Sequence, residues 1–416
     1  MINTVINTGK LIMLLMLLSL LSACASTTSS QKKDSPPVAL SKINQELPEE
    51  QLLDVWIELF DPGELPTKEK EALGLSEDIR EAEARYMPIQ LRGVMEKTGY
   101  WGAVRVVPYN TEGAELLVRG LIAASDGAEL ELKISAEDAS GRVWFRKTYK
   151  AEVDPQIYEM LPENIDSFQA VYRMIANDLA EYRNKLSDQE RIAIRQYADV
   201  RFAADMAPDA FASHLQRDDK GIYQLNRLPA ENDPAFQRVQ IIRERDFLLI
   251  DTLNGHFDNY YLEMVGPYTE WRKARSVEAA SLREIKKKAN TRKILGAAAI
   301  IGAIALEAMG SPSTRAATGT LRDVMVLGGA VAIKQGMDIN AQSPMHQAAI
   351  EELGDSFSSE AKPLVVEVDG EVYELTGSAE EQFNQWRALL RKIYYAETGF
   401  EPDPTQETVE SDPSEK

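Results

Sequence analysis

The side chains that most often perform catalysis or bind metals are few and scattered in this sequence. It contains three histidines, His214, His256 and His346, and none has a second histidine at metal-ligand spacing. The sequence has no GxSxG elbow, no P-loop and no HExxH motif. Acidic pairs are uninformative, because 66 of the 416 residues are Asp or Glu. We therefore predict no catalytic role, no metal and no cofactor, although an enzyme using two dispersed acids stays an alternative.

The only cysteine, Cys24, directly follows a hydrophobic segment. Residues 11–21 are uncharged, and Lys10 is the one charge before them. A run of eleven uncharged residues fits the central region of a signal peptide and is too short to span a bilayer as a helix. A single cysteine permits no internal disulfide. We therefore predict that residues 1–23 are a signal peptide.

The residues that end this segment, Leu21-Ser22-Ala23-Cys24, resemble the lipobox of bacterial lipoproteins. The resemblance implies cleavage before Cys24, diacylglycerol on its sulfur and an acyl chain such as palmitate on the new N-terminus. Two or more acyl chains anchor a protein stably to a membrane. Ala25 and Ser26 follow, and the absence of an aspartate there favours the outer membrane, with the protein facing the periplasm. An ordinary signal peptide with a free cysteine is the alternative.

Charge and composition narrow the class of partner. The formal net charge is −20 and the pI is about 4.8. Non-specific nucleic-acid binding needs a cationic surface that displaces counterions, so no nucleic-acid partner is expected. Apolar residues make up 44% of the chain, which is typical of a globular protein.

Patterns along the chain predict seven segments of an α+β protein. After the signal peptide we expect a lipidated flexible tether over 24–48, a small α/β domain over 49–187 and a helical region over 188–293 that ends in a basic segment. An apolar helical hairpin over 294–340, a β-hairpin and helix module over 341–399, and a disordered acidic tail over 400–416 would follow.

Within residues 49–187 the pattern is strand, helix, strand, three-stranded meander, helix. Residues 53–59, 104–108, 116–122, 130–136 and 143–150 are expected as strands, and 76–98 and 168–186 as helices. Pro88 is expected to kink or break the first helix. This order resembles the N-terminal domain of TolB, which also occurs in lipoprotein activators of penicillin-binding proteins and in the curli secretion channel subunit. The resemblance is carried by residues 99–108, 117–122, 125–134 and 137–145, and it implies a binding module.

Residues 272–293 form the one basic segment of this acidic chain. Nine cations oppose two acids there. A long helix is expected from Asp233-Pro234 towards residue 290, with possible breaks at Gly255 and at Gly266-Pro267. The candidates for contact with anionic lipid are Arg283, Lys286, Lys287, Lys288, Arg292 and Lys293.

Two uncharged runs, 294–306 and 324–333, follow the basic segment and are predicted to pair as a helical hairpin. Small residues lie at helical spacing on both runs, so two backbones could approach closely. The residues predicted to line this contact are Gly296, Ala298, Gly302, Gly328, Ala332 and Gly336. The hairpin could be buried within a soluble domain, could dip into lipid, or could join two protomers. Neither run has the roughly 20 residues of a full membrane span.

The C-terminal module has the clearest local signals. Residues 364–375 alternate around Asp369-Gly370, which predicts a hairpin with a type I′ turn. Ser378 and Glu381 form a capping box, and the helix that it opens is expected to end at Gly399.

Taken together, the sequence predicts a non-catalytic, lipid-anchored scaffold or assembly factor in the bacterial envelope. Its partners would be a membrane, through the anchor, and an envelope protein of unknown identity. Two alternatives are a homo-oligomeric export or channel component and a regulator of peptidoglycan synthesis.

Overall fold

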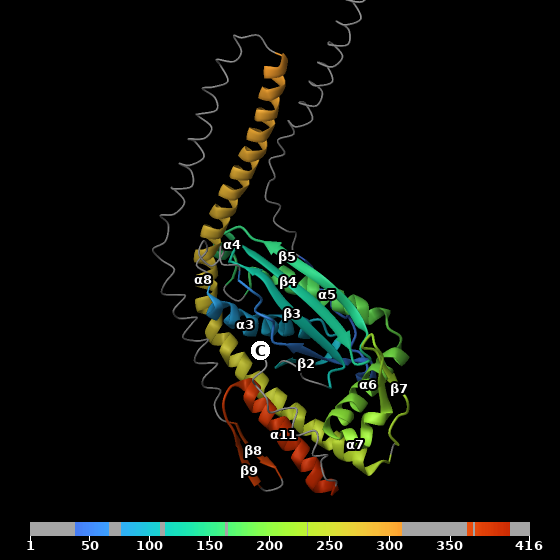
Figure 1. The fold of residues 1–416 in the computed structure, drawn as a ribbon. Coiled ribbons are helices and arrows are strands. Elements are labelled where there is room, and N and C mark those ends of the chain that lie inside the picture. The colour runs from blue at the N-terminus through green and yellow to red at the C-terminus, as the bar shows by residue number, and fades with distance from the viewer. Residues whose placement is uncertain are drawn as a thin grey trace, which may run out of the picture. The chain divides into compact units, whose positions relative to one another are not determined.

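A computed structural model describes residues 38–65, 76–108, 113–162, 165–230, 232–309, 364–368 and 371–399. It is a mixed α/β protein built on one five-stranded sheet (Figure 1). The signal peptide, Cys24 and most of the predicted tether lie outside the described residues, as do the second apolar run and the acidic tail.

The sheet has the strand order β2-β1-β3-β4-β5. Its members are β1 (Leu53–Glu58), β2 (Trp101–Val107), β3 (Leu116–Ser125), β4 (Glu129–Asp138) and β5 (Val143–Glu152). β1 runs parallel to both of its neighbours, and β3, β4 and β5 form an antiparallel meander. The predicted order of elements is therefore confirmed.

Helices α3 (Glu77–Glu96) and α5 (Gln169–Lys185) cover one face of this sheet. The strand residues on that face alternate with period two and are almost fully buried, as Val55, Val118, Leu132 and Ile134 illustrate. Tyr172, Ile175 and Leu179 meet them from α5. This layer forms the main core, because each strand contributes every second side chain to it.

α3 is continuous through Pro88, so the break expected there is wrong. Ser76 caps the helix by accepting the backbone N–H of Ile79. A proline at position 88 cannot donate to the carbonyl of Ala84. That carbonyl instead accepts the backbone N–H of Phe60, at 3.0 Å. The bond lost inside the helix is thus replaced by a contact that ties α3 to the end of β1.

The connection between β3 and β4 is a tight turn at Asp126-Gly127. Gly127 has φ of 84°, a left-handed conformation that favours glycine. A Cβ at this position would lie 2.4 Å from the backbone oxygen of Arg272. The turn therefore packs directly against the backbone of the long helix described below.

Smaller elements complete the body. They are η1 (Glu49–Gln51), α4 (Ile157–Met160), α6 (Asp188–Met206), α7 (Pro208–Phe211), η2 (Ala212–His214), β6 (Leu215–Arg217) and β7 (Tyr223–Leu225). A capping box of Ser187 and Glu190 opens α6. The hairpin of β6 and β7 was not predicted, since strands of three residues give too short an alternation to recognise.

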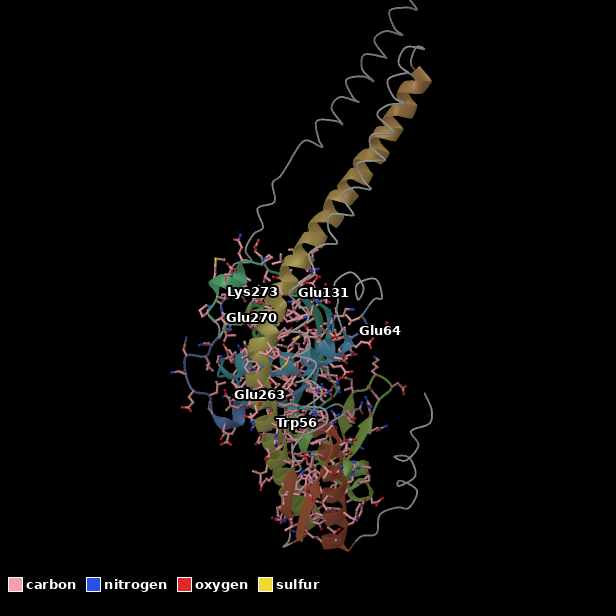
Figure 2. All side chains as sticks on the ribbon, turned by 90° about the vertical axis from the view of Figure 1, so that its left-hand side faces the viewer. Trp56, Glu64, Glu131, Glu263, Glu270 and Lys273 are labelled. Atoms are coloured by element: carbon pink, nitrogen blue, oxygen red, sulfur yellow. The ribbon has the colours of Figure 1, made fainter. Side chains whose placement is uncertain are left out.

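Helix α8 (Pro234–Met309) is a single helix of 76 residues. Asp233 caps it by accepting the N–H of Ala235, as its sequence predicts. The breaks considered at Gly255 and Gly266-Pro267 are absent. Pro267 removes the donor for the carbonyl of Glu263, and that residue lies on the exposed side of α8, where water can replace the bond (Figure 2). Buried Met264 and Tyr268 on the opposite side hold the helix in register.

The C-terminal module consists of β8 (Leu364–Val368), β9 (Glu371–Leu375) and α11 (Ala379–Thr398). The paired strands, the capping box and the helix end at Gly399 are confirmed, whereas the predicted turn residues Asp369 and Gly370 lie outside the described residues. α11 packs against α8 through the ion pairs Arg387–Asp246 and Arg238–Glu397, at 3.4 and 2.8 Å. The two helices are antiparallel, because the earlier residue of α11 pairs with the later residue of α8.

Candidate functional site

The face of β3, β4 and β5 that is turned away from α3 and α5 carries charged side chains, and we call it the open face. The β-ladder pairs Arg119 with Ser135, Lys133 with Thr148 and Glu131 with Lys150, so these side chains share one side of the sheet. Arg119, Lys133 and Lys150 are all exposed in the described part of the chain. A sheet surface of this kind can contact another macromolecule.

The open face ends in a groove of about 710 Å³ beside the last residues of β1. The groove lies at the carboxyl end of a parallel strand, which is the place where open α/β sheets commonly bind ligands. Charged side chains from β1, α3, β3, β4 and the segment after β1 line it: Glu58, Asp61, Glu81, Arg85, Arg119 and Lys133. Three acids and three bases make its lining balanced in charge.

Arg119 is the central cation of the groove. Its Nε donates to Oε2 of Glu58 at 2.9 Å, and Nη1 lies 3.8 Å from Glu137. The Glu58 side chain is almost fully buried, whereas Arg119 is 46% exposed. The pair therefore fixes the guanidinium while leaving much of it accessible.

Main-chain contacts make one wall of the groove rigid. Asp61 donates its N–H to the carbonyl of Gly120 and accepts the N–H of Ile122, which extends β1 by an isolated bridge. A side chain does not fit at position 120, because a Cβ on Gly120 would lie 2.5 Å from the ring of Phe60. Pro88 leaves the carbonyl of Ala84 without a helical donor, and that carbonyl accepts the backbone N–H of Phe60. This hydrogen bond holds the same wall from the side of α3.

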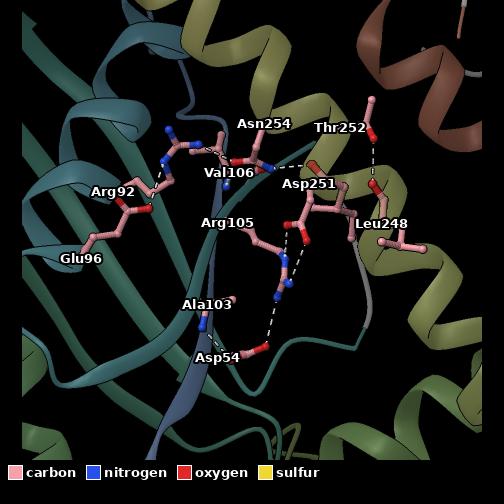
Figure 3. Close-up of polar contacts among 11 residues, drawn as sticks. Asp54, Arg92, Glu96, Ala103, Arg105, Val106, Leu248, Asp251, Thr252 and Asn254 are labelled. Carbon is pink, nitrogen blue, oxygen red and sulfur yellow. Dashed lines mark hydrogen bonds and ion pairs between the residues drawn. The ribbon is translucent and has the colours of Figure 1, made fainter. Parts of the chain in front are cut away.

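The open face covers only part of the sheet surface that is turned away from α3 and α5. The part of that surface formed by β1 and β2 is covered by α6 and α8. Trp56 of β1 packs edge-on against Phe247, with ring centroids 6.3 Å apart. Arg105 of β2 donates to Asp251 at 2.6 Å and to Asp54 at 3.0 Å (Figure 3). It also stacks over Phe247. Only the part of this face formed by β3, β4 and β5 is left to contact a partner, among the residues that the structure describes.

A buried polar cluster lies under α3, separate from the groove. Glu83 accepts hydrogen bonds from the hydroxyls of Ser125 and Tyr268, at 2.5 and 2.6 Å, and pairs with Arg80 at 3.2 Å. Burial raises the pKa of Glu83, and Arg80 opposes that shift. Every carboxylate oxygen has a partner and none reaches solvent, so the cluster joins α3, β3 and α8 rather than binding a ligand. Sequence patterns gave no signal for it.

The histidines occupy different environments. His214 is buried, packs against Phe211 and lies 3.1 Å from the carbonyl of Arg227 through Nδ1. His256 is half-buried on α8, and His346 lies outside the described residues. No group of three His, Cys, Asp or Glu side chains in the described part of the chain is arranged to hold a metal ion.

Four of the nine cations of the basic segment lie where α8 packs on the body. The Arg272–Asp166 pair, at 2.6 Å, is fully buried, and Arg275 is buried too. Lys273 lies 3.8 Å from Glu159. Arg283, predicted to contact lipid, forms an ion pair with Asp126 and lies 3.6 Å from Glu129.

The remaining predicted site residues are placed by backbone alone or not at all. Lys286, Lys287, Lys288, Arg292 and Lys293 lie on α8, as do Gly296, Ala298 and Gly302. Cys24, Gly328, Ala332 and Gly336 lie outside the described residues, so the structure pairs no second helix with the first apolar run.

No family model, curated protein or solved structure matches this chain. A search of the described helices found none with the length and apolar character of a membrane span.

Proposed function

We propose that this chain is a non-catalytic, lipid-anchored envelope protein at the periplasmic face of the outer membrane. It acts there as a scaffold or an assembly factor that binds a protein partner. The anchor is the acylated Cys24, and the partner binds on the open face of the sheet. The proposal that a protein partner binds here is supported by the open face and its groove, where charges of both signs are held in place around Arg119.

The resemblance to the TolB N-terminal domain agrees with this assignment, since that family consists of binding modules. The described order of strands and helices is the one on which the resemblance rests. A balanced groove suits a polypeptide segment that presents both acidic and basic side chains. Interfaces of this kind gain specificity and association rate from charge complementarity.

Mass spectrometry of the protein purified from its own membrane tests the anchor. We expect a mature chain that begins at Cys24 and carries acyl groups, and a Cys24→Ser variant that carries none. A mature form with an unmodified Cys24 would overturn the anchor.

Cross-linking in intact cells, followed by extraction in mild detergent, tests the partner site. The variant Lys133→Glu/Arg146→Glu reverses two exposed charges on the open face, and Lys42→Glu/Lys220→Glu reverses two exposed charges elsewhere. We expect the first variant to lose a cross-linked species that the wild type and the second variant keep. Equal cross-linking in all three would contradict the open face as the binding surface.

A further inference from the structure

The part of α8 beyond Arg283 differs from the part that packs on the body. Up to Arg283 the helix contacts the sheet, α3 and the β3–β4 turn through buried side chains. It then continues for 26 residues, about 39 Å. In Figure 1 this amber portion runs past the end of the sheet.

The structure divides the basic segment into two groups. Arg272, Lys273 and Arg283 have carboxylate partners in the body, and Arg275 is buried in it. Lys286, Lys287, Lys288, Arg292 and Lys293 lie about 5–15 Å farther along the helix axis than Arg283. Residues 285–306 contain these five cations and no acid. The second group therefore has a net positive charge that can attract an anionic partner.

We infer that residues 284–309 of α8 form a membrane-contact arm, in which the second group of cations binds anionic phospholipid headgroups and the uncharged run 294–306 enters the adjoining apolar layer. A basic segment followed directly by 13 uncharged residues combines electrostatic attraction to anionic headgroups with apolar surface for the acyl layer. The inference adds a second attachment to the proposed function, and it rests on the helix rather than on Cys24.

Vesicle flotation of the mature chain with Cys24→Ser tests the arm without the acyl anchor. We expect the protein to float with vesicles that contain phosphatidylglycerol and not with pure phosphatidylcholine. The variant Lys288→Gln/Arg292→Gln/Lys293→Gln should weaken binding by roughly 100-fold, because each cation near an anionic surface is worth about 1 kcal/mol. The matched control Lys42→Gln/Lys220→Gln/Lys392→Gln removes three exposed body charges and should bind like the parent.

A fluorescent label tests entry into the apolar layer. In the Cys24→Ser chain, Ile301→Cys supplies the only thiol for a polarity-sensitive dye, and its emission should shift to the blue with anionic vesicles. Leu262 is exposed on the part of α8 that packs on the body, so a dye on Leu262→Cys should show no shift.

The arm would be overturned by absence of flotation, by equal loss in the control triple, or by a dye shift that depends on protein concentration and not on lipid. The last result would assign the run to contact between protomers. An acylated Cys24 together with any of these would leave the proposed function standing and remove only the arm.

Discussion

At the scale of single residues, the most informative titratable group is Glu115, just before β3. It accepts the backbone N–H of Asp54 at 2.8 Å, and Arg195 of α6 lies 3.6 Å away. Burial, followed by the nearby charge of Asp54, raises the pKa of Glu115 to about 7, while Arg195 and Arg243 act in the opposite direction. The folded protein therefore favours the neutral carboxyl.

Replacing this group should change how stability depends on pH. The pKa of Glu115 rises from 4.5 towards 7 on folding, so its contribution is fully present below pH 4.5 and is lost as pH rises through 7. Glu115→Gln keeps an acceptor for Asp54 and cannot ionise. We expect similar urea midpoints for variant and parent at pH 5, and a variant more stable by about 1–3 kcal/mol at pH 8.

Glu81→Gln, which removes an exposed carboxylate of the groove, serves as the control and should leave the pH profile of stability unchanged. Parallel profiles for Glu115→Gln and the parent would contradict a titration near neutral pH at this site.

Residue-level prediction from the sequence succeeded where the signal was local. The caps at Asp233 and Ser378 were predicted because a capping side chain acts within three residues of its own position. The cluster around Glu83 could not be predicted, since Ser125 and Tyr268 are 42 and 185 residues away in sequence. Nothing in the spacing of those residues distinguishes them from surface side chains.

At the scale of elements, the contact between α8 and β2 explains how an edge strand is protected. The Asn254 side chain accepts the backbone N–H of Val106 at 2.8 Å and donates to its carbonyl at 2.9 Å (Figure 3). It also accepts a hydrogen bond from Arg92 of α3. One amide thus replaces a neighbouring strand, and an unpaired edge that could recruit another chain is covered.

Asn254→Ala should lower the free energy of unfolding by about 2–4 kcal/mol, because it leaves the N–H and C=O of Val106 buried without partners. Urea denaturation of the purified chain would measure this loss. Thr252→Ala removes a hydroxyl that bonds only within α8, on the exposed side, and should cost less than about 0.5 kcal/mol. Comparable losses for the two variants would show that Asn254 does not seal the strand.

Element boundaries followed from periodicity in the sheet domain, where strands and helices alternate between buried and exposed positions. The continuity of α8 did not follow, because Gly255, Gly266 and Pro267 are all residues that usually weaken helices. A Cβ on either glycine would meet no atom within 4 Å. Packing of residues 239–283 on the body supplies the stability that local propensity lacks.

At the scale of the whole molecule, the C-terminal module is part of the same core as the sheet domain. Asp246 of α8 is fully buried, and burial raises its pKa while Arg387 of α11 opposes the shift. Arg387 also stacks over Phe202 of α6 and Phe383 of α11. Three helices from separate parts of the chain therefore depend on one guanidinium.

Arg387→Leu should destabilise the protein by about 3–5 kcal/mol, because Asp246 would be left buried without its nearest cation. Adding Asp246→Leu should recover most of that loss, since an apolar pair can replace a buried ion pair at little cost. Thermal unfolding of the two single variants and the double variant completes the cycle. Additive losses would mean that the two residues are not coupled.

The fold class and the order of elements could be predicted from sequence, but the assembly of α6, α8 and α11 could not. Sequence patterns assigned residues 188–293 to a separate helical region, whereas the described part of that region packs on the sheet through Trp56 and Arg105 and on α3 through Tyr86. Helix amphipathicity reports that a face is buried and does not report which partner buries it.

The continuity of α8 has a mechanical consequence. A helix fixed along some 45 residues and extended as one rod behaves as a lever, with the rim at Asp126 as its fulcrum. A force on the distal end would produce torque on Asn254 and Arg105, and thereby on β2 at the edge of the sheet. Tension at a bilayer and a partner bound in the charged groove would then both act on the same sheet.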